Sequence, residues 1–177
     1  MLTCLNDWRT DRRGAAAVEF AFILPILLIF YLGTFEGSQA ISANRKVEAV
    51  ANTVGDLVAR SNTMDATRLA NITDIAAAIL SPFPVDGLGM TVTAVRVNAA
   101  GKATVDWSRA TKGTTLAAGS TYTLPSDLKA FTDTYLVFSS VTYSYKTMFS
   151  FGDMIPDMTM GTTYSFRPRK SAEIPWS

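Results

Sequence analysis

The sequence predicts an α+β protein in which an N-terminal transmembrane helix continues into an amphipathic helix packed on a roughly four-stranded antiparallel sheet. Three observations predict it. Residues 15 to 35 are almost entirely apolar. Apolar residues then recur every three or four positions to about residue 80, as on one face of a helix. From residue 90 onward apolar and polar residues alternate, as in half-buried strands.

The residue inventory excludes several functional classes. The chain has 177 residues, a net charge of +1 and no basic stripe, so we expect no nucleic-acid partner. It has no histidine and one cysteine, Cys4, which excludes disulfide frameworks, Cys/His zinc sites and histidine-based catalytic triads. We therefore expect no enzymatic activity, no cofactor and no metal. We interpret Cys4 as a passive thiol.

The apolar segment is long enough to cross a membrane. A helix over residues 15 to 35 would cover about 30 Å, the thickness of a bilayer's hydrocarbon core. Arg12 and Arg13 precede it, and the next basic residue is Arg45. The positive-inside tendency therefore favours a cytoplasmic N-terminus.

Glu19 is the sole charge in this segment. A carboxylate near a bilayer centre costs about 2.5 to 3.5 kcal/mol on the insertion scale, so a partner is expected. Two other interpretations stay open. Glu19 could snorkel to the interface of a plain anchor, or the segment could be a signal peptide cut after Ala40, which would release an exported soluble binding domain.

The residues around Glu19 resemble a known family. "RRGAAAVEF" is similar to the processing site of type IV prepilins. The longer stretch "RRGAAAVEFAFILPILLIFYLG", with "YSYKTMF" and "MTMGTTYSFRPR" near the C-terminus, resembles the TadE-like pseudopilins, minor pilins of the tight-adherence (Tad/Flp, type IVc) pilus. The stronger likeness covers residues 12 to 35, and the weaker one roughly residues 135 to 169.

The resemblance implies a pilin-like fold and a role in pilus assembly or initiation, adhesion and surface attachment. A prepilin peptidase would cut between Gly14 and Ala15 and remove a leader that carries the charges of Arg12 and Arg13. Glu19 would then pair with the new amine of Ala15 in a neighbouring subunit. Further implied partners are other pilins and pseudopilins, the inner-membrane assembly platform and membrane lipid.

The resemblance also implies a location and a division of the chain. The protein would cross the bacterial inner membrane once, with a cytoplasmic N-terminus and a periplasmic head, and could enter the extracellular pilus. Its parts would be a cytoplasmic leader, a transmembrane helix, an amphipathic stalk with a second helix, and a β-rich head: residues 1–14, 15–36, 37–81 and 82–177.

Two helical stripes, a hairpin of two strands, a short helical turn and two further strands complete the expected fold. The stripes are Val47, Val50, Val54, Leu57, Val58 and Ser61, then Leu69, Ile72, Ile75, Ala76 and Ile79. A hairpin around "NAAG" would place Ala103, Val105 and Trp107 on one face. "SDLKAF" predicts a short helical turn. In the longest strand, one side would carry Tyr135, Val137, Val141, Tyr143 and Tyr145. The segment "MTMGTTYSFRPR" would form the last strand of the sheet.

Three further sets of side chains each allow two interpretations. Aspartates could bind calcium, although surface and turn roles fit their spacing better: Asp86, Asp106, Asp127, Asp133, Asp153 and Asp157. Aromatic residues could form an adhesive strip or, as we favour, part of the core: Tyr135, Tyr143, Tyr145, Tyr164, Phe138 and Phe166. The basic tail, with Arg167, Arg169 and Lys170, is expected to be loosely ordered or to contact a neighbour's acidic surface.

Overall fold

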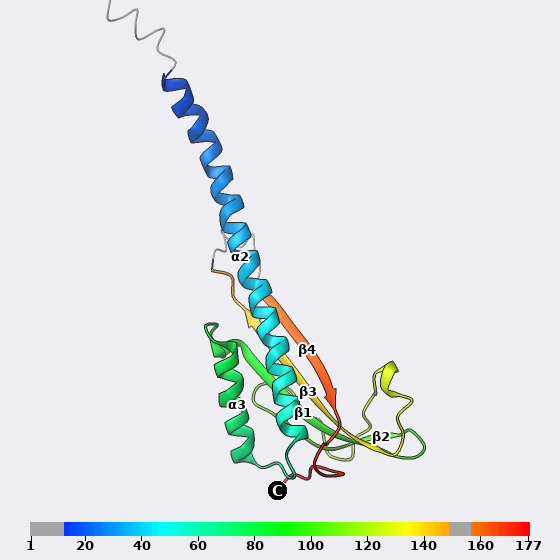
Figure 1. The fold of residues 1–177 in the computed structure, drawn as a ribbon. Helices are drawn as coiled ribbons and strands as arrows, with labels where there is room; N and C mark the ends of the chain where they lie inside the picture. Colours follow the sequence, from blue (N-terminus) through cyan, green and yellow to red (C-terminus); the bar gives the residue numbers. More distant parts are fainter. Residues whose placement is uncertain (1–12, 149–156) are drawn as a thin grey trace, which may run out of the picture. The chain divides into compact units, whose positions relative to one another are not determined.

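The computed structural model describes residues 13–148 and 157–177 (Figure 1). It contains two α-helices, two short 3-10 helices and four strands: α2 Arg13–Ala59, α3 Ala66–Leu80, η1 Val85–Gly87, β1 Leu88–Val97, β2 Ala103–Ala110, η2 Ser126–Leu128, β3 Thr134–Tyr145 and β4 Met158–Phe166. The chain divides into an N-terminal unit that ends at Gln39 and a C-terminal unit that begins at Ala40. The boundary falls inside α2.

Helix α2 is continuous over 47 residues and passes through Pro25. Within the C-terminal unit it buries one face, formed by Ala43, Val47, Val50, Ala51, Val54, Val58 and Ala59. These positions follow the three- and four-residue spacing of a helix face, and they confirm most of the predicted stripe. Leu57 is only partly buried, and Ser61 lies beyond the helix end, where its hydroxyl donates to the Leu57 carbonyl.

Helix α3 begins where the sequence predicts a cap. The Asp65 carboxylate accepts a hydrogen bond from the Arg68 amide at 2.7 Å, which satisfies one of the free amides of the first turn. The helix buries Ile72, Ala76 and Leu80. Leu69 and Ile79 are partly buried against the same core. The prediction was wrong at Ile75, which is 43% exposed.

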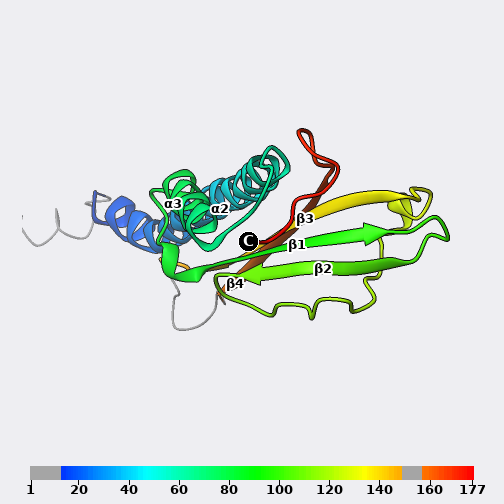
Figure 2. The same ribbon diagram turned by 90° about the horizontal axis from the view of Figure 1, so that it is seen from below.

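The four strands form one antiparallel sheet in the order β2-β1-β3-β4. The predicted four-stranded antiparallel sheet and the predicted α+β class are thus confirmed. Helices α2 and α3 cover the same face of the sheet (Figure 2). The predicted helical turn is η2, and the predicted hairpin joins β1 to β2.

One register prediction was wrong. Ala94 pairs with Trp107, but Val95 pairs with Val105, so β2 carries one extra residue, Asp106, at this point. Because successive residues of β1 face opposite sides, the bulge places Trp107 on one face of the sheet and Val105 on the other. Strict alternation had placed both on the same face.

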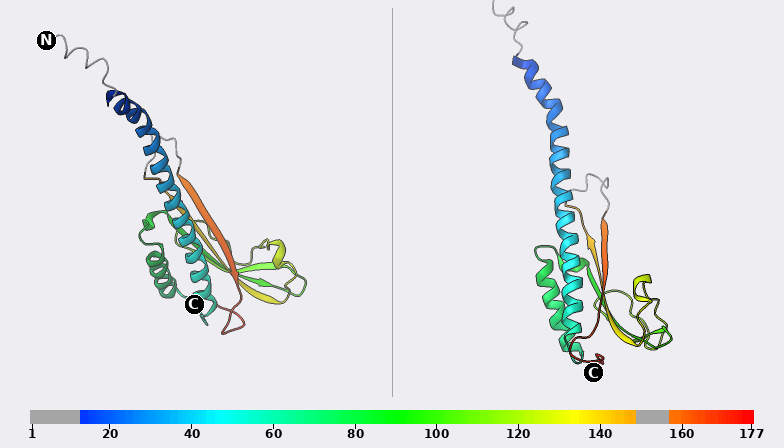
Figure 3. Two further views of the ribbon diagram at one scale, coloured as in Figure 1. Left: turned by 45° about the horizontal axis from the view of Figure 1, so that its top comes forward. Right: turned by 45° about the vertical axis from the view of Figure 1, so that its right-hand side comes forward.

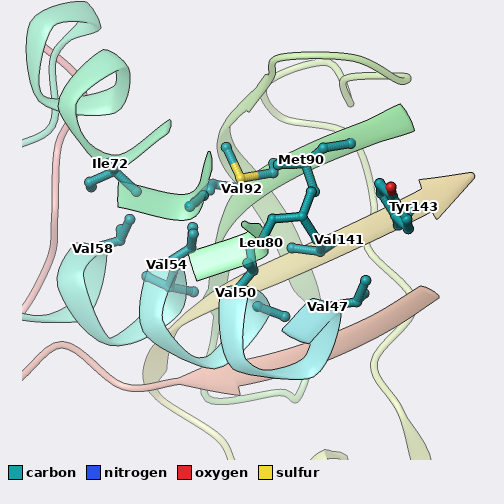
Figure 4. Close-up of a cluster of buried hydrophobic side chains, with 14 of the residues drawn as sticks. Val47, Val50, Val54, Val58, Ile72, Leu80, Met90, Val92, Val141 and Tyr143 are labelled. Carbon is teal, nitrogen blue, oxygen red and sulfur yellow. The ribbon is translucent and has the colours of Figure 1, made fainter. Parts of the chain in front are cut away.

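The main core lies between the helices and the sheet (Figure 4). The predicted face of β3 is confirmed, since its five members are all buried there: Tyr135, Val137, Val141, Tyr143 and Tyr145. A second, smaller core covers the opposite face of the sheet: Val95, Val97, Ala103, Leu124, Leu136 and Phe138, with Tyr122 and Leu128 packed against them. Strand β1 is therefore buried on both faces.

The C-terminal residues 169–177, which we call the C-terminal clasp, pack on the rest of the C-terminal unit. Ile174 is fully buried. The Met64 amide donates to the Pro175 carbonyl at 2.9 Å, and the Ser177 amide donates to the Met64 carbonyl at 2.8 Å. The expectation of a loosely ordered tail was therefore wrong, because the segment supplies backbone partners to the loop between α2 and α3.

The clasp also engages the end of α2 and the sheet. The Arg169 amide donates to the Ala59 carbonyl at 2.8 Å, and its guanidinium lies 3.3 Å from the Asp56 carboxylate. Glu173 forms a bidentate ion pair with Arg96 of β1. The predicted basic residue Arg169 thus contacts an acidic group of its own chain.

Candidate functional site

The apolar half of α2 is the candidate site. It is the one helix in the described ranges 13–148 and 157–177 that is long and apolar enough to cross a membrane, and its most apolar window has no buried residue. Its exposed large side chains cover the whole helix circumference: Val18, Phe20, Phe22, Ile23, Leu24, Ile26, Leu27, Leu28, Ile29, Phe30, Tyr31 and Phe35. A helix that is apolar on all sides is suited to lipid rather than to water.

The predicted processing and docking residues lie at the start of this helix. Gly14, Ala15 and Glu19 are all in α2. Ala15 and Glu19 are four positions apart, so they share a helix face at a separation of about 6 Å along the axis. The helix therefore places Ala15, the predicted new N-terminus, and the Glu19 carboxylate on the same face.

Neither Gly14 nor Glu19 has an evident structural role within the chain. A Cβ added to Gly14 would meet no heavy atom within 4 Å, so packing does not require glycine at this position. Glu19 is exposed, and no ion pair involving it forms among the residues that the structure describes. Arg12 and Cys4 lie outside the described residues, and Arg13 is the first residue of α2.

A polar cluster in the C-terminal unit was not anticipated. The Tyr135 hydroxyl donates to the Asp106 carboxylate at 2.6 Å. The Arg96 guanidinium, paired with Glu173, lies 3.9 Å from Asp106 and 5.8 Å from the centre of the Tyr135 ring. The cluster joins β1, β2, β3 and the clasp, which are distant in sequence, so no local pattern could have revealed it.

The electrostatics of this cluster indicate a structural role. Burial, together with the hydrogen bond to Asp106, raises the pKa of Tyr135 well above its usual value. The hydrogen bonds that the Arg96 guanidinium donates to the Glu173 carboxylate raise the pKa of Arg96. Both shifts favour the forms already present at neutral pH, a neutral phenol and a charged guanidinium. The groups hold the clasp in place and offer no nucleophile with a lowered pKa.

The aspartates proposed for calcium are dispersed. Asp86 is in η1 and Asp127 in η2. Asp106 accepts a hydrogen bond from Tyr135, Asp133 has a left-handed backbone with φ 50°, and Asp157 is exposed just before β4. Asp153 lies outside the described residues. Within the described parts of the chain, no three metal-binding side chains come together.

The aromatic set belongs mainly to the two cores. Tyr135, Tyr143 and Tyr145 face the helices, and Phe138 faces the second core. Phe166 is partly buried and lies against Gly55. Tyr164 is 38% exposed. These residues form no continuous exposed aromatic strip, because Tyr135, Tyr143, Tyr145 and Phe138 are all buried.

The fold and the apolar helix together define a class of protein, a single-pass membrane-anchored chain with an α+β unit outside the bilayer. Residues 14–56 match the family described as TadE-like protein, which confirms the resemblance drawn from "RRGAAAVEF" over that range. The family is a structural, pilin-type one associated with Tad pili. No curated protein and no solved structure matches the chain.

Proposed function

We propose that this chain is a pseudopilin, or minor pilin, of a bacterial Tad pilus and acts in pilus assembly or initiation, with adhesion and surface attachment as consequences. It acts as a structural subunit and not as an enzyme. The observation that carries the proposal is the family match. It begins at Gly14 and includes the N-terminal part of α2, where apolar side chains are exposed on every side of the helix. Residues 15–36 would anchor it in the inner membrane, with the C-terminal unit in the periplasm.

Processing after Gly14 is the first part of the proposal. A prepilin peptidase would act on the bond between Gly14 and Ala15, next to the leader charges Arg12 and Arg13. The absence of any packing requirement at Gly14 supports a role for glycine in recognition by a peptidase. Gly33 and Gly37 are equally free of neighbours, so the position after the arginine pair distinguishes Gly14.

Docking through Glu19 is the second part. After cleavage Ala15 would carry an ammonium group one helical turn from Glu19. In a low-dielectric medium a carboxylate and an ammonium attract far more strongly than in water. A single charge left alone there is costly. The amine of a neighbouring subunit would therefore be the preferred partner of Glu19, and the pair would set the register between subunits and link the chain to other pilins and the assembly platform.

The second candidate function is an exported soluble binding domain. The boundary between the two compact units, after Gln39, lies one residue from the signal peptidase site after Ala40, so a released fragment would keep the buried face that starts at Ala43. Cleavage there would interrupt the continuous helix α2. The N-terminal residue of the mature protein distinguishes the two functions: Ala15 for the pseudopilin, Ile41 for the exported domain.

A further inference from the structure

Strand β4 forms an edge of the sheet that carries little protection against another strand. It is the last strand in the order β2-β1-β3-β4 (orange in Figure 3), and β3 is its only ladder partner within residues 13–148 and 157–177. The ladder with β3 runs without a register shift, and β4 contains no charged residue and no proline. Charges, prolines and bulges are the usual protection of an edge strand, so β4 is open to strand addition.

The other edge strand, β2, has several of these protective features. It carries a bulge at Asp106 and a second charged residue, Arg109, near its end. Its outer edge is also partly covered, because the Val105 amide donates to the Ser120 carbonyl at 2.9 Å. β4 is therefore the less protected of the two edges.

The charges that flank β4 are complementary in a two-fold pair of strands. Asp157 directly precedes the strand and Arg167 directly follows it, and both are exposed. If two copies pair antiparallel about Thr162, Asp157 of each copy lies opposite Arg167 of the other. Opposite charges placed across a strand pair stabilise it.

Both charges lack an ion-pair partner within the described parts of the chain. The Arg167 guanidinium lies 4.3 Å from the centre of the Phe131 ring, a contact that leaves its charge unneutralised. A second copy would supply the missing carboxylate to Arg167 and the missing guanidinium to Asp157.

The same register matches the uncharged side chains on the face that the helices cover. Met158, Met160, Tyr164 and Phe166 lie on this face, since their partners in β3 do. In a pair centred on Thr162, Met158 would lie opposite Phe166, and Met160 opposite Tyr164. Methionine sulfur makes favourable contacts with aromatic rings, so the apolar pairs support the same register as the charged pairs.

The side chains of β4 are accessible on both faces. Met158 is 37% exposed and Tyr164 is 38% exposed, although both lie on the helix side of the sheet. Thr159 and Ser165 are exposed on the other face. In the register centred on Thr162 these two hydroxyl residues would lie opposite each other, where they can form a hydrogen bond.

We propose that the β4 edge binds the β4 edge of a second copy of this chain, antiparallel and centred on Thr162, and that two C-terminal units thereby form a two-fold dimer with one continuous sheet. A two-fold interface requires a surface that is complementary to itself, and the flanking charges and the methionine–aromatic pairs meet this requirement. The proposal rests on the C-terminal unit alone and does not depend on the proposed function.

Disulfide cross-linking of the full chain tests the register. Every variant carries Cys4→Ser, since Cys4 is the only cysteine. The chain is held in detergent micelles, because the two-fold axis reverses one copy relative to the other and a micelle lets each anchor take any direction. Thr162→Cys should form a disulfide-linked dimer by itself. Thr159→Cys and Ser165→Cys should cross-link to each other but not to themselves, since identical positions would lie about 20 Å apart.

A charge exchange tests the specificity. In Asp157→Arg, and equally in Arg167→Asp, like charges would face each other at both ends of the pair. Each variant alone should therefore dimerise at least about fivefold more weakly than the unsubstituted chain, as measured by sedimentation equilibrium. A mixture of the two variants restores opposite charges at both ends and should dimerise about as strongly as the unsubstituted chain. Recovery in the mixture excludes a folding defect in either variant.

Four results would overturn the proposal. They are a chain that stays monomeric in the micelles, cross-linking of Thr159→Cys to itself as efficient as to Ser165→Cys, dimerisation that Arg167→Asp leaves unchanged, and weakened dimerisation that the mixture does not restore. A dimer that is insensitive to the β4 variants would place the contact in another part of the chain. None of these outcomes bears on cleavage after Gly14, so the proposed function is tested separately.

Discussion

The indole Nε1 of Trp107 donates a hydrogen bond to the carbonyl oxygen of Ile174, and the two atoms lie 2.7 Å apart. This contact joins β2 to the C-terminal clasp across 67 positions of sequence. The ring of Trp107 also packs on that of Trp176, with centroids 5.5 Å apart, and the Arg109 guanidinium lies 4.3 Å from the centre of the Trp176 ring. The clasp is thus part of the fold and not an appendage.

Loss of the clasp contact should destabilise the C-terminal unit. Trp107→Phe keeps a ring but leaves the buried Ile174 carbonyl with one fewer donor, and we expect the free energy of unfolding to fall by about 1 to 3 kcal/mol. Urea unfolding followed by circular dichroism measures it. Lys170→Ala, an exposed clasp residue, is the matched control and should change stability by less than about 0.5 kcal/mol. Equal effects of the two changes would contradict a structural clasp.

Stability should decrease at alkaline pH partly through Tyr135. Its pKa is raised in the folded protein, whereas in the unfolded chain it ionises near pH of about 10. Above that pH the folded state holds more protons than the unfolded state, so the free energy of unfolding falls as pH rises. Tyr135→Phe should show a shallower fall between pH of about 9.5 and 11.

In Tyr135→Phe, the remaining fall of the free energy of unfolding at alkaline pH should come from other tyrosines. Burial also raises the pKa of Tyr122 and of Tyr143, so Tyr135→Phe should reduce the dependence without abolishing it. Urea unfolding at a series of pH values provides the measurement. A slope in Tyr135→Phe as steep as that of the unsubstituted chain would show that this phenol does not titrate differently in the two states.

Replacement of Gly55 by alanine should destabilise the C-terminal unit. A Cβ at this position would overlap the Phe166 ring, so Gly55→Ala would displace β4 from α2 and lower the free energy of unfolding by about 1 to 3 kcal/mol. Gly37→Ala is the matched control in the same helix, since its Cβ would meet no heavy atom within 4 Å, and there alanine should be neutral or stabilising by up to about 1 kcal/mol. The melting temperatures of the two variants compare the sites directly, and an unchanged value for Gly55→Ala would refute the close packing of Phe166.

Glu19 should be dispensable for insertion but needed for pilus formation. Glu19→Ala lowers the free energy of membrane insertion by up to about 3 kcal/mol. It also removes the proposed partner of the Ala15 amine in a neighbouring subunit. We expect normal membrane fractionation and reduced piliation, counted by electron microscopy. Glu48→Ala, a carboxylate change on the exposed face of the same helix, should be neutral. Normal piliation with Glu19→Ala would contradict the docking role and favour the alternative, in which Glu19 extends to the membrane interface.

Local signals predicted much of the fold. The buried face of α2 follows from helical spacing, and the hairpin follows from "NAAG", where the Asn98 side chain accepts from the amides of Ala100 and Lys102 and Gly101 adopts a φ of 77°. Those interactions involve residues at most four apart, so the sequence expresses them directly.

Long-range features were not predictable in the same way. The bulge at Asp106 breaks the alternation that Ala103, Val105 and Trp107 imply, and the clasp depends on partners such as Arg96 and Met64 that only the folded chain brings near. At the candidate site the motif predicted the positions of Gly14, Ala15 and Glu19, and the structure adds that Ala15 and Glu19 share one face of α2. The roles proposed for these residues would involve a peptidase and other subunits, and such contacts leave no trace in the fold of a single chain.

The N-terminal sequence of the mature protein, purified from whole cells that carry the pilus system and from their culture medium, tests the central proposal most directly. We predict a chain that starts at Ala15, with full-length precursor accumulating when Gly14 is replaced by leucine. A mature chain that starts at Ile41, or normal processing of the Gly14→Leu variant, would contradict the account.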